Sequence, residues 1–188
     1  NLWFWGALTC FSQEHMQTFG YLWSMLPIIK ELYPDKKEQQ EKIHAYTAFF
    51  NTNPMLGSVI IGTTASMEEA RANGKGIDGE TINDMRAGLM GPIAGIGDSL
   101  IDGTLIPILL GLALGMSQNG SPVGAIFYII VWDLIAYFGQ RFLYFRGYKL
   151  GDKAVSILVG KQGKAIRHAI SIIGGMVVGG VLASWVNV

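Results

Sequence analysis

The sequence has few charged residues and almost no cysteine. Only 15% of its 188 residues are charged, against about 25% in ordinary soluble domains, and half are hydrophobic. That hydrophobicity excludes a disordered chain, which needs low hydrophobicity and high net charge. The 14 basic residues are balanced by 14 acidic ones, which argues against a nucleic-acid binder. The single cysteine, Cys10, excludes a disulfide framework and a cysteine-built zinc site.

Glycine, in contrast, is abundant. The 25 glycines are about twice the usual share of about 7%. A composition that is apolar, rich in glycine and poor in charge is typical of membrane proteins, because glycine lets helices approach closely in lipid. Backbone polar groups in lipid must be paired within their own segment, so we expect an all-α integral membrane protein with transmembrane helices. The chain begins and stops inside apolar stretches, and we interpret it as part of a longer protein truncated at its C-terminus.

Basic residues are missing from one long window, between Arg86 and Arg141. We predict a membrane-embedded region over 88–188, with spans near 103–118, 122–141 and 168–188. The last contains 20 uncharged residues, which at about 1.5 Å per residue cross a hydrocarbon core of about 30 Å. The first two are short and must extend into their flanks or lie partly inside an assembly. A large soluble protein with buried helices is the alternative, but it would leave little surface for water.

The basic residues also indicate an orientation. Seven of the 14 lie between 141 and 167, against one acidic residue, so the positive-inside rule places this segment in the cytoplasm. The uncharged turn Ser117–Pro122 then lies outside, between two antiparallel spans. Small residues recur on one face of Ile170–Val186. We expect that face to pack against another helix.

Residues 1–87 are less apolar, and we predict an amphipathic, interfacial and cytoplasmic helical region there. Aromatic residues crowd the first 25 positions, as in helices at the membrane boundary, and Pro27 and Pro34 bound the end of that helix. Asp35 is the expected N-cap of a cytoplasmic helix that runs to a break at Phe49–Pro54. The apolar stretch Met55–Ala65 suits a half-span or re-entrant element.

The segment Gly91–Gly103 holds four glycines, a proline and two aspartates at the mouth of an apolar run. It predicts a broken or re-entrant element, because helices break at membrane depth only where they are buried in protein or line a watery cavity. Asp98 can cap a helix that begins near Ser99, contact a solute, or do both. A nucleotide loop is rejected, since no strand precedes Gly95–Gly97 and no Gly-Lys-Ser/Thr follows.

The decamer Met90–Ser99 resembles the signature of the IID membrane component of mannose-family (mannose/fructose/sorbose) sugar phosphotransferase systems. The resemblance covers essentially the whole chain, and family members continue beyond it with further apolar segments. Other segments agree with the family in the same order: Glu14–Gln17, Phe49–Pro54, Met67–Ala70, Gly103–Leu105, Gly147–Gly151, Ile172–Val181 and Ala183–Val186.

The resemblance implies a multi-pass subunit of the bacterial cell (inner) membrane that pairs with a homologous IIC partner. Similar proteins translocate a hexose while a cytosolic IIB protein, charged by IIA, phosphorylates it. The phosphoryl-carrying histidines belong to IIA and IIB, so this transport subunit is expected to have no catalytic residue, metal or cofactor. This agrees with His15, His44 and His168, which show no His–carboxylate or metal-ligand spacing.

Three positions depart from the family pattern and leave the sugar open. Arg is common where this chain has His15, an aromatic residue where it has Asp102, and Arg where it has Ile106. Asp102 and Ile106 lie beside the glycine-rich segment, so the substrate can differ from mannose, as in relatives that handle fructose, sorbose or amino sugars.

A sugar site needs several side chains that donate and accept hydrogen bonds where water is excluded. Such groups gather at the two predicted breaks, with Asn51, Thr52 and Asn53 at one, and Asp98 and Ser99 at the other. We predict that the two breaks approach each other and line, or directly support, the sugar pathway. The alternative is that both only cap helices and position a site on the IIC partner.

Two other functions remain open from the sequence. Asp98, Asp102 and Asp133 are acidic residues in apolar surroundings, as in an ion-coupled secondary transporter. The resemblance also implies a role as a docking site for bacteriocins, secondary to transport.

Overall fold

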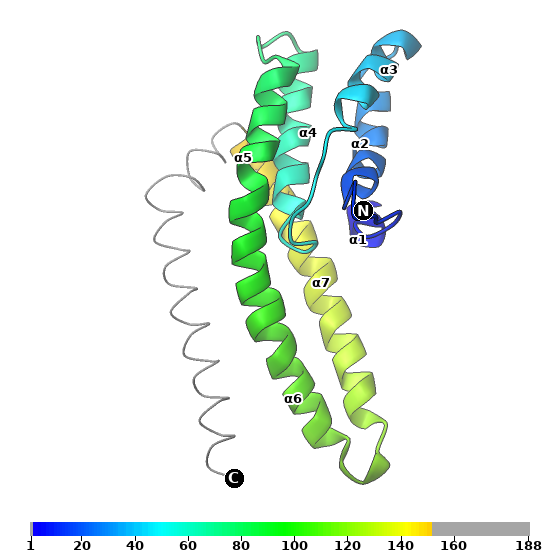
Figure 1. The fold of residues 1–188 in the computed structure, drawn as a ribbon, viewed down its shortest axis with the longest axis vertical. Coiled ribbons are helices and arrows are strands. Elements are labelled where there is room, and N and C mark those ends of the chain that lie inside the picture. Colours follow the sequence, from blue (N-terminus) through cyan, green and yellow to red (C-terminus); the bar gives the residue numbers. More distant parts are fainter. Residues whose placement is uncertain (1, 152–188) are drawn as a thin grey trace.

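The structure, a computed structural model, describes residues 2–151, and no strand occurs among them. The predicted all-α membrane fold is confirmed for this part of the chain (Figure 1). The helices are α1 (Leu2–Gly6), α2 (Thr18–Leu32), α3 (Lys36–Ala45), α4 (Ser58–Ala72), α5 (Gly79–Gly97), the π-helix η1 (Asp98–Leu105), α6 (Ile106–Met116), the 3₁₀-helix η2 (Gln118–Gly120) and α7 (Val123–Leu150).

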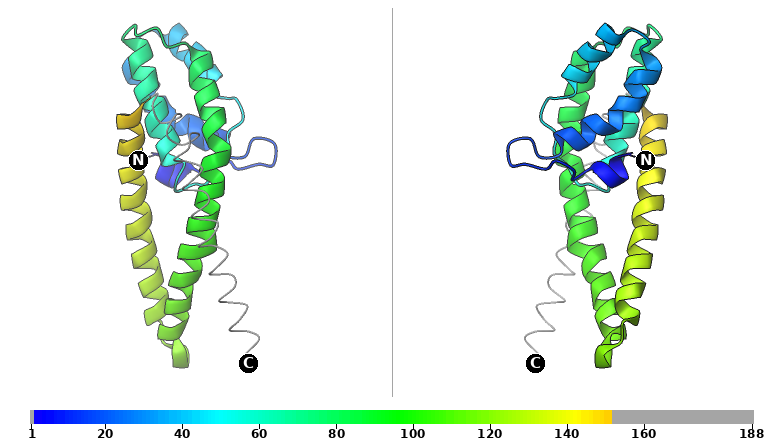
Figure 2. Two further views of the ribbon diagram at one scale, coloured as in Figure 1. Left: turned by 90° about the vertical axis from the view of Figure 1, so that its left-hand side faces the viewer. Right: turned by 90° about the vertical axis from the view of Figure 1, so that its right-hand side faces the viewer.

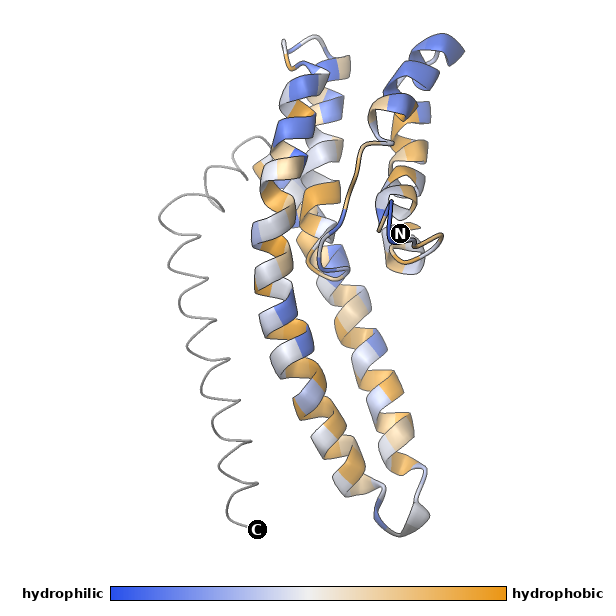
Figure 3. Cartoon of the chain, in the orientation of Figure 1, coloured by the Kyte–Doolittle hydropathy of each residue, from blue (hydrophilic) through white to orange (hydrophobic). Residues whose placement is uncertain are grey.

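Two of these helical stretches are long and apolar enough to cross a membrane. Helices α5, η1 and α6 join into one 38-residue helix, and α7 has 28 residues. The turn at 117–122 connects them, as predicted, and Figure 2 shows the two helices converging on it. Apolar residues predominate along α6 and much of α7 (Figure 3), and many of them are exposed; Leu114, for example, is 71% exposed. In water such a surface would be costly, whereas in lipid it is the expected one.

The prediction of a broken element over Gly91–Gly103 is wrong. The helix continues through Pro92, Gly95 and Gly97 and changes only its winding, from α to π at Asp98. A continuous helix keeps the backbone groups paired, as lipid requires, and a single proline is tolerated in such helices. Asp98 therefore lies inside the helix and is not the cap of a helix that begins near Ser99.

Helix α4 is the centre of the packed region, and most of Met55–Ala65, predicted as a half-span or re-entrant element, lies in its first half. Residues 58–65 are all buried, and α4 packs against α2, α5 and α7. At its crossing with α7, a side chain at Gly62 would overlap the backbone of Tyr144. A side chain at Gly147 would likewise overlap the backbone of Val59. The two glycines thus permit backbone-to-backbone approach.

The N-terminal helices pack beside α4, on the half of the molecule remote from the turn at 117–122 (Figures 1 and 2). Helix α2 runs through Pro27 and ends at Leu32, so Pro34 bounds it but Pro27 does not. Asp35 caps α3 as predicted, because its carboxylate accepts the N–H of Glu38 at 3.1 Å. The predicted span at 168–188 and the small-residue face of Ile170–Val186 lie outside the described residues.

Candidate functional site

The connection between α3 and α4 contains the Phe50–Pro54 loop, which has no regular structure of its own. Side chains from the N-terminal region hold both of its ends. The Thr18 hydroxyl accepts the N–H of Phe50 at 2.9 Å, and the Trp3 indole donates to the carbonyl of Pro54 at 2.7 Å. Contacts with α1 and α2 therefore fix both ends of the loop.

Asn53 joins this loop to the long membrane helix. Its side chain is buried, and its Nδ2 donates to Asp98 Oδ1 at 3.2 Å and to Asp102 Oδ2 at 2.9 Å. Its Oδ1 accepts the backbone N–H groups of Met55 and Leu56 at 3.1 and 3.2 Å. The predicted approach of the two segments is thus confirmed. We call Asn53, Asp98 and Asp102 the Asn53 cluster.

Gly97 is required for this contact. A Cβ atom built at Gly97 would overlap the Asn53 side chain, so any other residue there would push the loop away from the helix. At Gly88, Gly91 and Gly95, by contrast, no atom of the described residues lies within 4 Å of such an atom. Within residues 2–151, Gly97 is therefore the position in Gly91–Gly97 at which a distant side chain approaches the helix backbone, whereas Gly91 and Gly95 have no such neighbour.

The remaining predicted site residues are placed less directly. Asn51 is exposed, and its backbone N–H points to Met90 Sδ at 3.3 Å. Thr52 is buried, and its hydroxyl donates to the carbonyl of Met90 at 3.2 Å. The Ser99 hydroxyl donates to the carbonyl of Gly95 at 2.9 Å, within its own helix. The structure thus brings Asn53 and Asp98 together and commits the hydroxyls of Thr52 and Ser99 to backbone.

Sequence reasoning left Asp102 out of the predicted site. Asp98 and Asp102 are four residues apart, which places them on one side of a helix. That signal was readable only if the segment was taken as helical, and the predicted break concealed it.

The Asn53 cluster has hydrogen-bonding capacity to spare. Asp98 and Asp102 are exposed within the described residues and share one amide group as donor. Each ionised carboxylate accepts about four hydrogen bonds, so acceptor positions remain for the hydroxyls of a solute. Among residues 2–151, no group of three or more His, Cys, Asp and Glu side chains could hold a metal ion.

A second polar cluster lies in the core between α2, α3 and α4 and is fully enclosed. Glu68 has no exposed surface; it accepts the Tyr33 hydroxyl at 2.6 Å, the Tyr46 hydroxyl, and Arg71 Nη1 at 3.5 Å. Burial, followed by the hydrogen bond and the charge of Glu68, raises the pKa of Tyr33, and burial is likewise the main reason that the pKa of Tyr46 is raised. We call this the Glu68 cluster.

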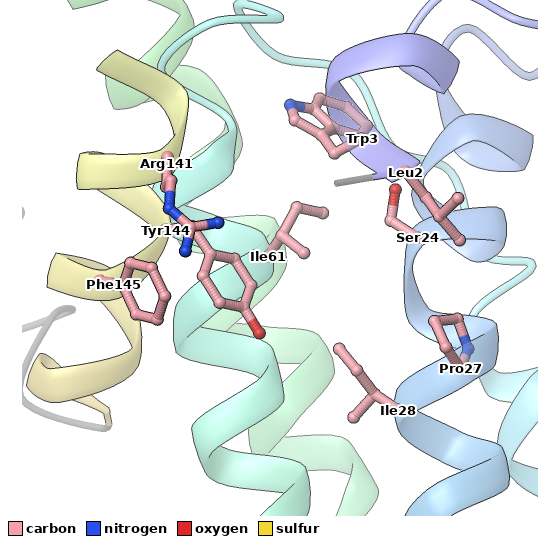
Figure 4. Close-up of a pocket in the computed structure, with 9 residues that line it drawn as sticks. All are labelled: Leu2, Trp3, Ser24, Pro27, Ile28, Ile61, Arg141, Tyr144 and Phe145. Atoms are coloured by element: carbon pink, nitrogen blue, oxygen red, sulfur yellow. The ribbon is translucent and has the colours of Figure 1, made fainter. Parts of the chain in front are cut away.

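A cavity of about 260 Å³ lies between α1 and α2 on one side and α4 and α7 on the other (Figure 4). It contains none of the predicted site residues. Its polar groups include the Ser24 hydroxyl, which already donates to the carbonyl of Gly20 at 2.8 Å, and those of Arg141 and Tyr144. The Asn53 cluster, which brings together residues predicted for the site, remains the candidate site. The cavity is lined by Leu2, Trp3, Ser24, Pro27, Ile28, Ile61, Arg141, Tyr144 and Phe145.

Comparison with known proteins identifies the family. The model of the PTS system mannose/fructose/sorbose family IID component matches residues 1–188. The chain belongs to this family. As a member of this family it is a membrane protein related to permease components of mannose-family phosphotransferase systems, and the match does not favour an ion-coupled secondary transporter.

The IID component resembles curated proteins with different sugars in their names. It is 35% identical to the fructose permease IID component of Bacillus subtilis, over 96% of this chain and 66% of that protein. It is 36% identical to the mannose-specific EIID component of Escherichia coli K12, over 93% of this chain and 62% of that protein. The chain thus spans slightly less than two thirds of the length of these relatives.

Solved structures agree with the fold. A cryo-EM structure of the mannose transporter ManYZ in complex with microcin E492 matches with a TM-score of 0.77 at 33% identity, covering 98% of this chain and 68% of that chain. A second membrane-protein structure matches with a TM-score of 0.84 at 33% identity, covering 96% and 66%.

Proposed function

We propose that this IID component translocates a hexose across the bacterial inner membrane together with a IIC partner, for phosphorylation by a IIB protein that IIA charges. The relatives support this, since their names specify fructose, mannose and sorbose systems. The observation that carries the proposal is the Asn53 cluster, in which a buried amide holds two exposed carboxylates on a membrane-length helix.

The distribution of polarity supports a multi-pass topology with residues 88–188 in the membrane and residues 1–87 at the interface and in the cytoplasm. Polar residues gather on α3 and at the start of α5, and apolar residues along α6 and much of α7 (Figure 3). Helix α7 ends with Arg141, Arg146 and Lys149, which favours a cytoplasmic location for that end. The turn at 117–122 then lies outside.

The Asn53 cluster suits a sugar because sugar hydroxyls both donate and accept. Ionised carboxylates accept strongly, and charge-assisted hydrogen bonds are about twice as strong as neutral ones. Acidic residues on a membrane helix are costly unless they serve a partner or a solute. We propose that Asn53, Asp98 and Asp102 contact the sugar, with exposed Asn51 at the edge of the path and Thr52 and Ser99 shaping it through their backbone hydrogen bonds.

The test is uptake of a sugar panel by cells that carry the full-length chain with its IIC partner and cytosolic proteins, using Asn53→Ala and Asp98→Asn. Loss of a sugar contact worth about 1.4 kcal/mol raises the KM about tenfold. Matched controls are Asn73→Ala and Asp84→Asn, which alter exposed residues outside the cluster and are expected to keep the wild-type KM. Normal assembly with wild-type rate and affinity in both test variants would refute the pathway assignment.

We also propose that this chain carries no phosphoryl group during the reaction. Replacing His15, His44 and His168 together by Gln is expected to leave sugar phosphorylation in the assembled system within about twofold of wild type, because none is part of the phosphoryl relay. Loss of phosphorylation with normal assembly would contradict this.

A second role, as a receptor for a bacteriocin, is favoured by one observation, the likeness to ManYZ solved with microcin E492. The test is binding of purified microcin E492 to vesicles that contain the full complex. Binding that a saturating sugar does not change would support a surface separate from the pathway, and no binding would remove this candidate.

A further inference from the structure

Gln17 clamps the peptide groups of Thr52 with both ends of its side-chain amide. Its Nε2 donates to the carbonyl of Thr52 at 2.8 Å, and its Oε1 accepts the N–H of Thr52 at 3.0 Å. The backbone N–H of Gln17 also donates to the carbonyl of Phe50 at 2.9 Å. Gln17 and Thr52 are both buried, so water does not compete for these hydrogen bonds.

The backbone that carries Gln17 adopts a strained conformation. Met16 has φ +48°, in the left-handed region that residues other than glycine rarely enter. Two isolated β-bridges hold the Met16 backbone in this conformation. One is to Ser12, whose carbonyl accepts the N–H of Met16 at 2.7 Å, and the other is to Phe50. Such conformations persist where the surrounding structure fixes them, and they cluster at functional sites.

The clamp lies one residue from the Asn53 cluster. The Thr52 peptide groups leave little freedom to the Asn53 backbone, and the Asn53 amide must meet Asp98 at 3.2 Å and Asp102 at 2.9 Å simultaneously. A displacement of the loop by a fraction of an ångström would break one of the two contacts, because hydrogen bonds weaken steeply away from their preferred geometry.

We propose that Gln17, held by the left-handed backbone at Met16, is a positioning residue that sets the Phe50–Pro54 loop so that Asn53 orients Asp98 and Asp102 for the sugar; this rests on the proposed function. Gln17 touches neither carboxylate in the structure and acts through the peptide of Thr52. The N-terminal region therefore contributes to sugar affinity although it lies outside the membrane-length helices.

The first test is Gln17→Met in the full-length chain with its IIC partner, which keeps the size of the side chain and removes both hydrogen bonds. We expect the KM for the transported sugar to rise about tenfold, the effect of about 1.4 kcal/mol, while the maximal rate and the amount of complex change by less than about twofold. Gln39→Met is the matched control. Its amide also bonds a backbone carbonyl, that of Tyr33 at 2.6 Å, but lies on α3 away from the loop, so the KM should not change.

Gln17→Glu adds a chemical readout that a merely structural role would not give. When protonated, the introduced carboxyl group can donate to the Thr52 carbonyl and accept its N–H, as the amide does; when ionised, it can only accept. The KM of this variant, divided by the wild-type KM at each pH, is therefore expected to fall as the pH is lowered. A ratio that is constant with pH would contradict the clamp.

A second pair of variants tests the backbone at Met16. Asn tolerates the left-handed region and β-branched residues do not, so Met16→Asn should keep the wild-type KM and Met16→Val should raise it at least fivefold. If Gln17→Met prevents assembly, this pair decides. Equal KM values for the two variants, or a wild-type KM for Gln17→Met, would overturn the proposal. A wild-type complex that takes up no sugar would instead refute the proposed function itself.

Discussion

The Glu68 cluster and the Asn53 cluster both contain carboxylates on helices. They differ in how much of each carboxylate is exposed and in how many donors surround it. Glu68 has no exposed surface, and two tyrosine hydroxyls and Arg71 surround it. Asp98 and Asp102 are exposed and share a single amide donor. A polar network in which every group is hydrogen-bonded makes a core rigid and specific. Carboxylates on a membrane helix that have free acceptor positions are expected to bind a solute or a partner protein. The buried Glu68 cluster is therefore expected to stabilise the fold, and the exposed Asn53 cluster is available for binding.

The largest effect is expected from removing the central carboxylate of the Glu68 cluster. Glu68→Ala leaves the buried hydroxyls of Tyr33 and Tyr46 and the partly exposed guanidinium of Arg71 without their acceptor, and each buried polar group left unsatisfied costs about 1–3 kcal/mol. We expect a clear fall in the thermal unfolding midpoint and in recovered complex. Glu41→Ala, on the exposed surface of α3, is the control and should change neither. An unchanged midpoint for Glu68→Ala would show that the cluster does not hold the fold.

The next largest effect is expected from separating Asn53 from Asp98 and Asp102 without replacing any residue of the Asn53 cluster. Gly97→Ala places a methyl group where the Asn53 side chain lies. Uptake at low sugar concentration should therefore fall at least tenfold, which corresponds to a loss of about 1.4 kcal/mol of binding free energy. Gly95→Ala adds the same methyl group two residues away, where no atom of residues 2–151 lies within 4 Å. It should leave uptake unchanged and can stabilise the helix by up to about 1 kcal/mol. Equal uptake in the two variants would contradict the close approach.

Alkaline pH is expected to lower the free energy of unfolding through the buried tyrosines, which the Glu68 cluster has and the Asn53 cluster lacks. Burial raises the pKa of Tyr21 from 10.0 to about 12, and it also raises the pKa values of Tyr33 and Tyr46. The folded state then holds protons that the unfolded state releases, so this contribution to stability is complete below pH 10 and is lost as the pH rises from 10 towards 12 and beyond. Unfolding by denaturant across this range is expected to show the decline.

Tyr46→Phe is the variant that assigns this decline to the Glu68 cluster. It removes one titrating group, so its free energy of unfolding should fall less steeply above pH 10 than that of the wild type. Parallel declines in the two proteins would show that Tyr46 does not contribute to the alkaline loss.

The smallest effect is expected from Ser99→Ala. The Ser99 hydroxyl already donates to the carbonyl of Gly95 in the same helix, which keeps its own backbone hydrogen bonds when the hydroxyl is removed. We expect the KM for sugar to change by less than twofold in an uptake assay beside Asp98→Asn. A tenfold rise would place the Ser99 hydroxyl in contact with the sugar and widen the Asn53 cluster.

The sequence was sufficient for the features that depend on periodicity and hydropathy. The all-helical class, the turn at 117–122 and the cap at Asp35 follow from apolar runs and from the preference of Asp for a helix N-terminus, and the structure has all three. The approach of Asn53 to Asp98 was also predicted, although from two helix breaks, and the structure makes this contact without a break at Asp98.

The sequence could not show why the glycines are present. Glycine serves equally to end a helix and to admit a neighbouring group, and only the packed structure shows that Gly97 does the second. That ambiguity produced the wrong break at Gly91–Gly103 and hid Asp102. Gln17 was beyond reach for another reason: its partner Thr52 is 35 positions away in the sequence, and no local pattern records a contact between a side chain and a distant peptide group.

The continuity of the helix from Gly79 to Met116 has a mechanical consequence. A helix of 38 residues is a rod of about 57 Å, and the Asn53 cluster lies near its middle, where the rod meets the Phe50–Pro54 loop. A tilt of the rod about that contact moves its two ends in opposite directions. Any solute that shifts Asp98 or Asp102 therefore acts on a lever, whose polar arm begins at Gly79 and whose apolar arm ends at the turn at 117–122.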